Sequence, residues 1–83
     1  MLIKRNENEG ILSWINRGMT EFRNFSGGEP KKLIMNSTNI NELRTRLGQE
    51  ELFDQFKSEP EIILGMQLNG NDFVKIDQLQ IRG

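Results

Sequence analysis

The stretch from residue 61 to residue 82 constrains the fold most, because it alone has the sustained alternation of a β-strand. Apolar side chains occupy the even positions from 62 to 68, and this period of two predicts a strand with one buried face. Asn69-Gly70 follows directly, and both residues tolerate the positive φ that a type I′ turn requires. We therefore predict a β-hairpin with its turn at Asn69-Gly70.

The return strand of this hairpin is predicted at residues 72–76, where aromatic and β-branched side chains favour a strand. The apolar residues that come later fall on the opposite parity from Val74 and Ile76. We therefore expect a bulge or bend near residues 77–78, followed by a short final strand. A cation-binding loop at residues 69–72 is the alternative to the turn, but this segment lacks the acid spacing of a calcium loop.

Residues 10–25 form the second strong pattern, that of an amphipathic helix. At about 100° per residue, their apolar side chains fall within an arc of roughly 160° on a helical wheel. Gly18 lies inside this arc, where its missing side chain allows another backbone to approach closely. The arc is formed by Ile11, Leu12, Trp14, Ile15, Met19, Phe22 and Phe25.

Two roles fit this helix. Packed on the sheet it is an ordinary core helix, which is the commoner use of such a pattern. Left partly uncovered it is a docking helix, because aromatic side chains and methionine are favoured as interface anchors. A membrane-surface helix is disfavoured, because the polar face carries few cations. In the docking interpretation, the residues that bind a protein partner are Ile11, Trp14, Ile15, Met19, Phe22 and Phe25.

Between these two patterns the chain is expected to form a loop, a strand and one or two helices. The loop covers residues 26–30, which contain a paired glycine and a proline, and a short apolar strand follows at residues 31–35. Side chains with N-cap oxygens fill residues 36–39, so a helix is predicted from there to Gly48. One or two further helical turns are expected at residues 49–57.

The 83 residues are predicted to form one small α+β domain. Its expected parts are an N-terminal helical segment over residues 1–26, a loop over 27–30 and an α+β body over 31–83. The body should hold a strand, one or two helices and a C-terminal β-hairpin with a short final strand. Leu2 and Ile3, ahead of the first helix, are expected to form an edge strand or to pack as a tail.

The composition removes much of the chemistry that an enzyme needs. The chain has no cysteine and no histidine, so it lacks thiolate and imidazole metal ligands and the usual general base near neutral pH. An acidic cluster at residues 50–54 is better explained as a solvated helix face. We therefore expect no catalytic residue, no metal site, no cofactor and no enzyme activity.

Charge and hydropathy limit the kinds of partner. The formal net charge is −1, and the basic residues gather only at Lys4, Arg5, Lys31 and Lys32, which argues against a nucleic-acid partner. Neither a signal peptide nor a membrane-spanning stretch is visible, so we expect an intracellular protein without a membrane partner.

The central part of the chain resembles a unit found in tailed-phage structural proteins. Leu33-Ile34-Met35-Asn36-Ser37 comes first, a helix with Leu43 and Leu47 follows, and Ile63-Leu64-Gly65-Met66 comes next, within residues 31–68. This order resembles a strand–helix–strand unit of major capsid proteins and of small phage proteins. Ser37 and Gln67 stand where that unit often has proline. The resemblance implies a virus- or prophage-encoded protein that works through protein contacts, and it carries over no catalytic residue.

These observations together predict a small non-enzymatic interaction or assembly protein, located in a virion or in the host cytoplasm. Its partner would be a second copy, giving a homo-oligomer, or another viral or host protein. The alternative is a phage regulatory protein that binds and inhibits a host enzyme or defence protein. A nucleic-acid binder that uses the basic residues named above is the weakest of the three hypotheses.

Overall fold

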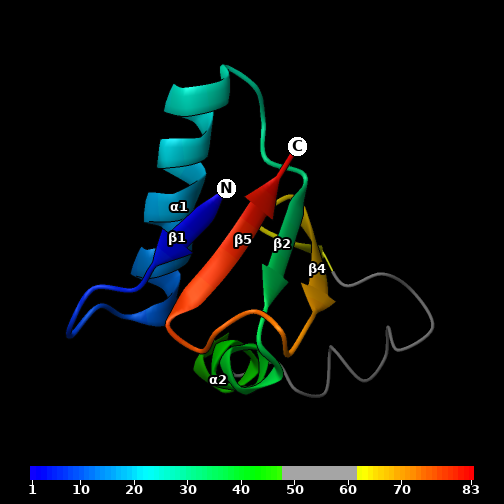
Figure 1. Ribbon diagram of the computed structural model, residues 1–83. Coiled ribbons are helices and arrows are strands. Elements are labelled where there is room, and N and C mark those ends of the chain that lie inside the picture. The colour runs from blue at the N-terminus through cyan, green and yellow to red at the C-terminus, as the bar shows by residue number, and fades with distance from the viewer. Residues whose placement is uncertain (48–61) are drawn as a thin grey trace.

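The chain folds as a mixed β-sheet with helices packed against it (Figure 1). The computed structural model describes residues 1–47 and 62–83. The architecture confirms the predicted α+β class. The helical turns expected at residues 49–57, the helix end at Gly48 and the acidic cluster at residues 50–54 lie outside the described residues. The described elements are β1 (Leu2–Lys4), α1 (Ile11–Ser26), β2 (Lys32–Met35), α2 (Ser37–Leu47), β3 (Ile62–Ile63), β4 (Met66–Gly70) and β5 (Gln78–Arg82).

β2 is the central strand of the sheet, whose strand order is β1-β5-β2-β4-β3. Leu33 in β2 pairs with Ile81 of antiparallel β5 on one side and with Leu68 of parallel β4 on the other. The strand predicted at residues 31–35 is therefore confirmed as β2. β1 pairs with β5, so Leu2 and Ile3 form an edge strand rather than a loose tail.

The predicted hairpin turn at Asn69-Gly70 is wrong. β4 continues through both residues, where it pairs in parallel with β2, and residues 72–76 form turns rather than a strand. The final strand β5 instead pairs with β2 and β1. This arrangement buries Leu79 and Ile81 completely. Burial of apolar area outweighs the local preference of an Asn-Gly pair for a tight turn. The apolar residues do change parity after Ile76, as expected. The cause is a turn in which the Gln78 amide donates a hydrogen bond to the Lys75 carbonyl.

The hairpin that does form joins β3 to β4 through Leu64-Gly65. Ile63 pairs with Met66, and the two residues between them have φ values of 50° and 81°, as in a type I′ turn. Paired residues point to the same face, so the turn places Ile63 and Met66 in the core and leaves Leu64 half exposed. The predicted unbroken strand with Leu64 on its buried face is therefore incorrect.

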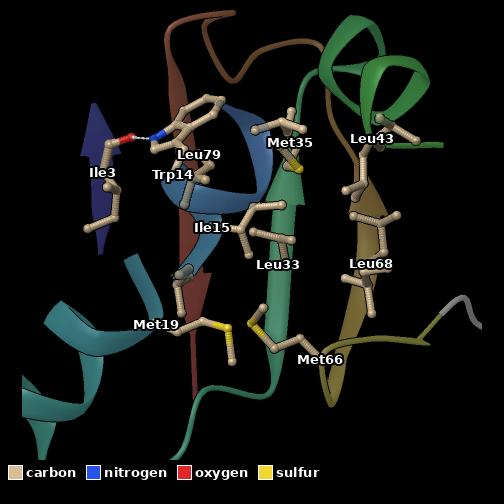
Figure 2. Packing of buried hydrophobic residues seen from close by; sticks show 14 residues of the cluster. Ile3, Trp14, Ile15, Met19, Leu33, Met35, Leu43, Met66, Leu68 and Leu79 are labelled. Carbon is tan, nitrogen blue, oxygen red and sulfur yellow. Dashed lines mark hydrogen bonds between the residues drawn. The ribbon is translucent and has the colours of Figure 1, made fainter. Parts of the chain in front are cut away.

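The apolar face of α1 covers one face of the sheet and forms the core with it (Figure 2). Trp14 and Ile15 are fully buried, and Trp14 Nε1 donates a hydrogen bond to the Ile3 carbonyl at 3.1 Å. At Gly18 the helix comes so close to the sheet that an added Cβ would lie 2.9 Å from Ile81 Cδ1. The close approach predicted for this glycine is found, but the nearest atoms belong to side chains of the sheet and not to another backbone.

α2 begins where the N-cap residues predicted it. Asn36 Oδ1 accepts a hydrogen bond from the Thr38 amide at 2.9 Å, and the Asn36 carbonyl accepts one from Ile40. Ile40 and Leu43 then face the core. Within residues 1–47 and 62–83, neither helix has the length and apolar character needed to cross a bilayer.

Gly18→Leu tests the close contact between α1 and the sheet. The larger side chain would collide with Ile81 and with Ile3, whose Cγ1 would lie only 3.2 Å from the added Cβ. We expect a loss of about 1–3 kcal/mol in the free energy of unfolding, measured by urea denaturation. Asn16→Leu, at an exposed position of the same helix, is the matched control and should change stability little. Equal urea midpoints for the two variants would contradict the packing.

Leu64→Asn tests the hairpin turn. A bulky residue at positive φ is strained, whereas Asn-Gly is the preferred pair for a type I′ turn. We expect the asparagine variant to be more stable by about 1 kcal/mol, seen as a higher melting temperature. Leu64→Val should have the opposite effect, because β-branched residues tolerate positive φ least. A lower melting temperature for Leu64→Asn would show that the turn has another geometry.

Candidate partner-binding surfaces

The six residues predicted to bind a partner through α1 are placed mostly inside the protein. Ile11, Trp14, Ile15 and Met19 are buried in the core, where they offer a partner no surface in this fold. Phe22 is half-buried and packs against the core, whereas Phe25, in the last turn, is 82% exposed. The interpretation of α1 as a core helix therefore accounts for five of the six side chains.

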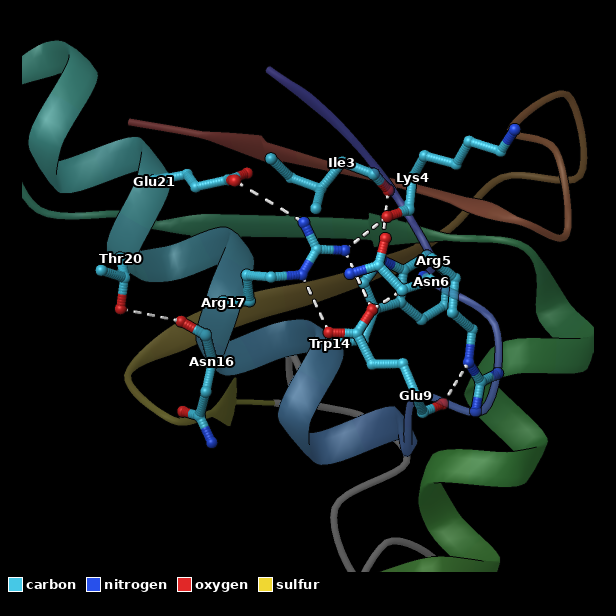
Figure 3. A network of polar contacts seen from close by, with 10 residues as sticks. All are labelled: Ile3, Lys4, Arg5, Asn6, Glu9, Trp14, Asn16, Arg17, Thr20 and Glu21. Atoms are coloured by element: carbon cyan, nitrogen blue, oxygen red, sulfur yellow. Dashed lines mark hydrogen bonds and ion pairs between the residues drawn. The ribbon is translucent and has the colours of Figure 1, made fainter.

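A network of polar contacts fastens the chain ahead of α1 to that helix (Figure 3). Arg17 Nε donates to Glu9 Oε2 at 2.8 Å, and Arg17 Nη2 donates to the Lys4 carbonyl and to Glu9 Oε1. The Asn6 amide also donates to Glu9 Oε1, at 2.9 Å. The hydrogen bonds from Arg17, and then the one from Asn6, lower the pKa of the Glu9 carboxyl to about 2. The network is a structural clasp, because each charge in it has a partner within the fold.

Arg5 extends this clasp to α2. Its guanidinium forms a bidentate pair with Glu42, at 2.9 and 3.1 Å, and lies 5.2 Å from the centroid of the Trp14 ring. The hydrogen bond from Arg5 lowers the pKa of Glu42. Of the basic residues considered for nucleic-acid binding, Arg5 is therefore occupied within the fold, whereas Lys4, Lys31 and Lys32 are exposed.

No group of three or more acidic side chains that could hold a metal ion occurs in the described parts of the chain. The lowered pKa values of Glu9, Glu42 and Asp72 each arise from a hydrogen bond within the fold. These carboxylates stabilise the structure.

The connection between β4 and β5, residues 71–77, is a strongly hydrogen-bonded loop. The Asn71 amide donates to the Met35 carbonyl at 2.9 Å, and Asp72 Oδ1 accepts a bond of 2.9 Å from the Ser37 amide at the start of α2. The bond from Ser37 lowers the pKa of Asp72. Asn71 Oδ1 also accepts from the Phe73 amide, which makes an Asx turn.

Two asparagines on and before α2 hold the second half of the same loop. Asn36 Nδ2 donates to the Val74 carbonyl at 3.2 Å, and Asn39 Nδ2 donates to the Ile76 carbonyl at 2.8 Å. Asn39 is 2% exposed and Val74 is 9% exposed, so both side chains anchor the loop in the protein interior. The backbone of the 71–77 loop is thus fixed by contacts with β2 and α2.

This rigid loop displays large apolar side chains to solvent. Phe73 is 98% exposed and Ile76 is 57% exposed, with the buried Val74 between them. An aromatic side chain held in the open on a fixed backbone is typical of an interface anchor. The strand predicted at residues 72–76 is therefore replaced by a loop. The Asn71-Asp72 pair, with its tendency to form Asx turns, was the signal for a loop.

The stability of the clasp should depend on pH in the acidic range. Because the pKa of Glu9 is about 2 in the fold, against 4.5 normally, its stabilising effect is complete above about pH 4.5. The effect is lost as the pH falls from there through 2. Urea midpoints measured from pH 6 to pH 2 should therefore decline in this window, with Glu42 and Asp72 acting in the same direction.

Glu9→Gln should lower the stability at neutral pH and flatten the decline below pH 4.5, because the carboxyl that titrates is gone. Glu7→Gln, an exposed neighbour in the same connection, is the matched control and should leave the pH profile as it is. A profile of the Glu9 variant parallel to that of the wild type would show that the clasp does not stabilise the fold.

Comparison with protein-family models, with curated proteins and with solved structures finds no match to this chain. A function is therefore argued from the chemistry and geometry of its surfaces.

Proposed function

We propose that this chain is a small non-enzymatic protein that binds another protein and acts as an assembly component. The observation that carries the proposal is the 98% exposure of Phe73 on a loop whose backbone is fixed by hydrogen bonds. Burying a phenylalanine side chain at an interface is favourable by about 1.5–3 kcal/mol. Little ordering entropy opposes that gain when the loop is already rigid.

The neighbouring residues suit the same purpose. Ile76 adds a second exposed apolar side chain to the loop, and Lys75 between them adds a charge that can select a partner. Val74 does not contribute to the surface, because its side chain is buried. The loop thus combines exposed apolar and charged side chains, as interface patches do.

The phage origin is also a proposal, and the order of elements supports it. β2, α2, β3 and β4 occur in this order in the region of the resemblance to tailed-phage structural proteins, and β2 and β4 are parallel neighbours. A virion or morphogenesis component works through contacts with other proteins. The alternative is a phage regulator that uses the same loop to inhibit a host enzyme or defence protein.

Phe73→Ala tests whether the loop mediates self-assembly. We expect the wild-type protein to associate as its concentration rises, measured by light scattering. The variant should lower the association constant by roughly tenfold to a hundredfold, the equivalent of the lost burial. Phe25→Ala removes the same side chain from an exposed position on α1 and is the matched control. Circular dichroism of both variants verifies that the fold is retained.

A second copy is excluded as the partner if the wild-type protein stays monomeric at every concentration. The regulator alternative then predicts a different protein at the loop. A photo-crosslinking phenylalanine analogue at position 73 should capture one defined host or viral protein, and the same analogue at position 25 should not. Equal capture from both positions would contradict the proposal.

A further inference from the structure

The face of the sheet turned away from α1 carries positively charged side chains and, among its described residues, no negatively charged ones. Strand alternation assigns to it the side chains that do not enter the core, and all of them are exposed or half-buried. Three are cations, four are amides and three are apolar, and none is acidic. This surface, which we call the open face, consists of Leu2, Lys4, Lys32, Ile34, Ile62, Gln67, Asn69, Gln78, Gln80 and Arg82.

The strand register makes the open face a continuous patch. Lys32 lies between Arg82 on β5 and Gln67 on β4, and Gln67 in turn lies beside Ile62 on β3. In the next row, Ile34 has Gln80 on one side and Asn69 on the other. Because neighbouring strands are about 4.8 Å apart, the patch extends for roughly 20 Å across the sheet.

Lys32 and Arg82 form a pair that folding alone disfavours. They lie directly opposite each other on antiparallel strands, where like charges are destabilising. Within the described segments, no carboxylate lies within ion-pair distance of Lys4, Lys32 or Arg82, whereas Arg5, Arg17 and Arg23 each pair with a glutamate. The acidic residues of those segments all lie off the open face, at Glu7, Glu9, Glu21, Glu29, Glu42, Asp72 and Asp77.

We propose that the open face docks an acidic protein segment whose carboxylates alternate with apolar side chains. Lys32 and Arg82 would meet the carboxylates, and the planar guanidinium of Arg82 can bind one of them with two hydrogen bonds. Ile34 and the apolar residues at the sheet edges, Leu2 and Ile62, would receive the partner's apolar side chains. The amides between them can satisfy the partner's polar groups.

Two other occupants fit this surface less well. A second copy docked face to face would bring the cations of both open faces together, which like-charge repulsion opposes. Single-stranded nucleic acid is bound by aromatic side chains that stack on bases, and none of the ten residues of the open face is aromatic.

The proposal does not rest on the 71–77 loop, because the two cations that carry it lie away from that loop. The loop follows Gly70 at one end of β4, whereas Lys32 and Arg82 lie at the opposite end of the sheet, where β2 begins and β5 ends. Phe73→Ala should therefore leave binding at the open face unchanged, so each proposal can fail without the other.

The test titrates the full chain, labelled with ¹⁵N, with a synthetic peptide of alternating glutamate and leucine at about 50 mM salt. We expect shifts of the backbone amide signals of β5, β2 and β4, and binding that weakens as salt is added. A lysine–leucine peptide of equal length and a thymidine 20-mer are the comparison probes. Stronger binding of the oligonucleotide, or no binding of the glutamate–leucine peptide, would overturn the proposal. Loss of the β5, β2 and β4 signals through dimerisation without peptide would also overturn it.

Variants assign the binding to individual groups. Lys32→Gln with Arg82→Gln should weaken peptide binding by about five- to tenfold, since two exposed charge pairs are lost. Arg46→Gln, an exposed cation on α2 and off the open face, is the matched control and should have no effect. Ile34→Ala should also weaken binding of the peptide but not of polyglutamate, because only the former has apolar side chains to bury. Equal affinities for all variants would overturn the proposal.

Discussion

The packing of Trp14 between α1 and the sheet is the interaction on which the rest of the structure depends. The indole is fully buried, and its N–H donates to the Ile3 carbonyl, so burial leaves no unpaired donor. Arg5 lies against the ring and pairs with Glu42, which ties α2 to the same centre. One side chain thus links both described helices to the edge of the sheet. An 83-residue chain without cysteine has few other means of stabilising its thin core.

The burial of Trp14 limits which apolar side chains of α1 remain at the surface. Because most of the apolar arc of α1 is buried in the core, the large exposed apolar side chains of the described residues, apart from Phe25, belong to the connections and the sheet edges. Within the 71–77 loop, the side chain of Val74 is buried, whereas that of Phe73 is held in solvent.

Sequence reasoning succeeded where local patterns and tertiary packing agree. The wheel of α1, the strand at β2 and the N-cap at Asn36 each depend on residues close in sequence, and all three are found in the structure. It failed at Asn69-Gly70, where the local signal for a turn competes with pairing to strands far away in the chain. β5 lies between β1 and β2, and the gain from burying Leu79 and Ile81 there decides the outcome.

The sequence by itself determined the fold class, the amphipathic helix and the lack of histidine and cysteine chemistry. Composition can be counted directly, and periodicity depends only on residues close together in the chain. Only the tertiary structure decided which apolar residues remain outside, since Leu64, Phe73 and Ile76 look like core residues until their strands are paired. It also decided that Lys32 and Arg82, 50 positions apart in the numbering, lie side by side. Register between distant strands is set by the burial of whole faces, and no short stretch of sequence contains that information.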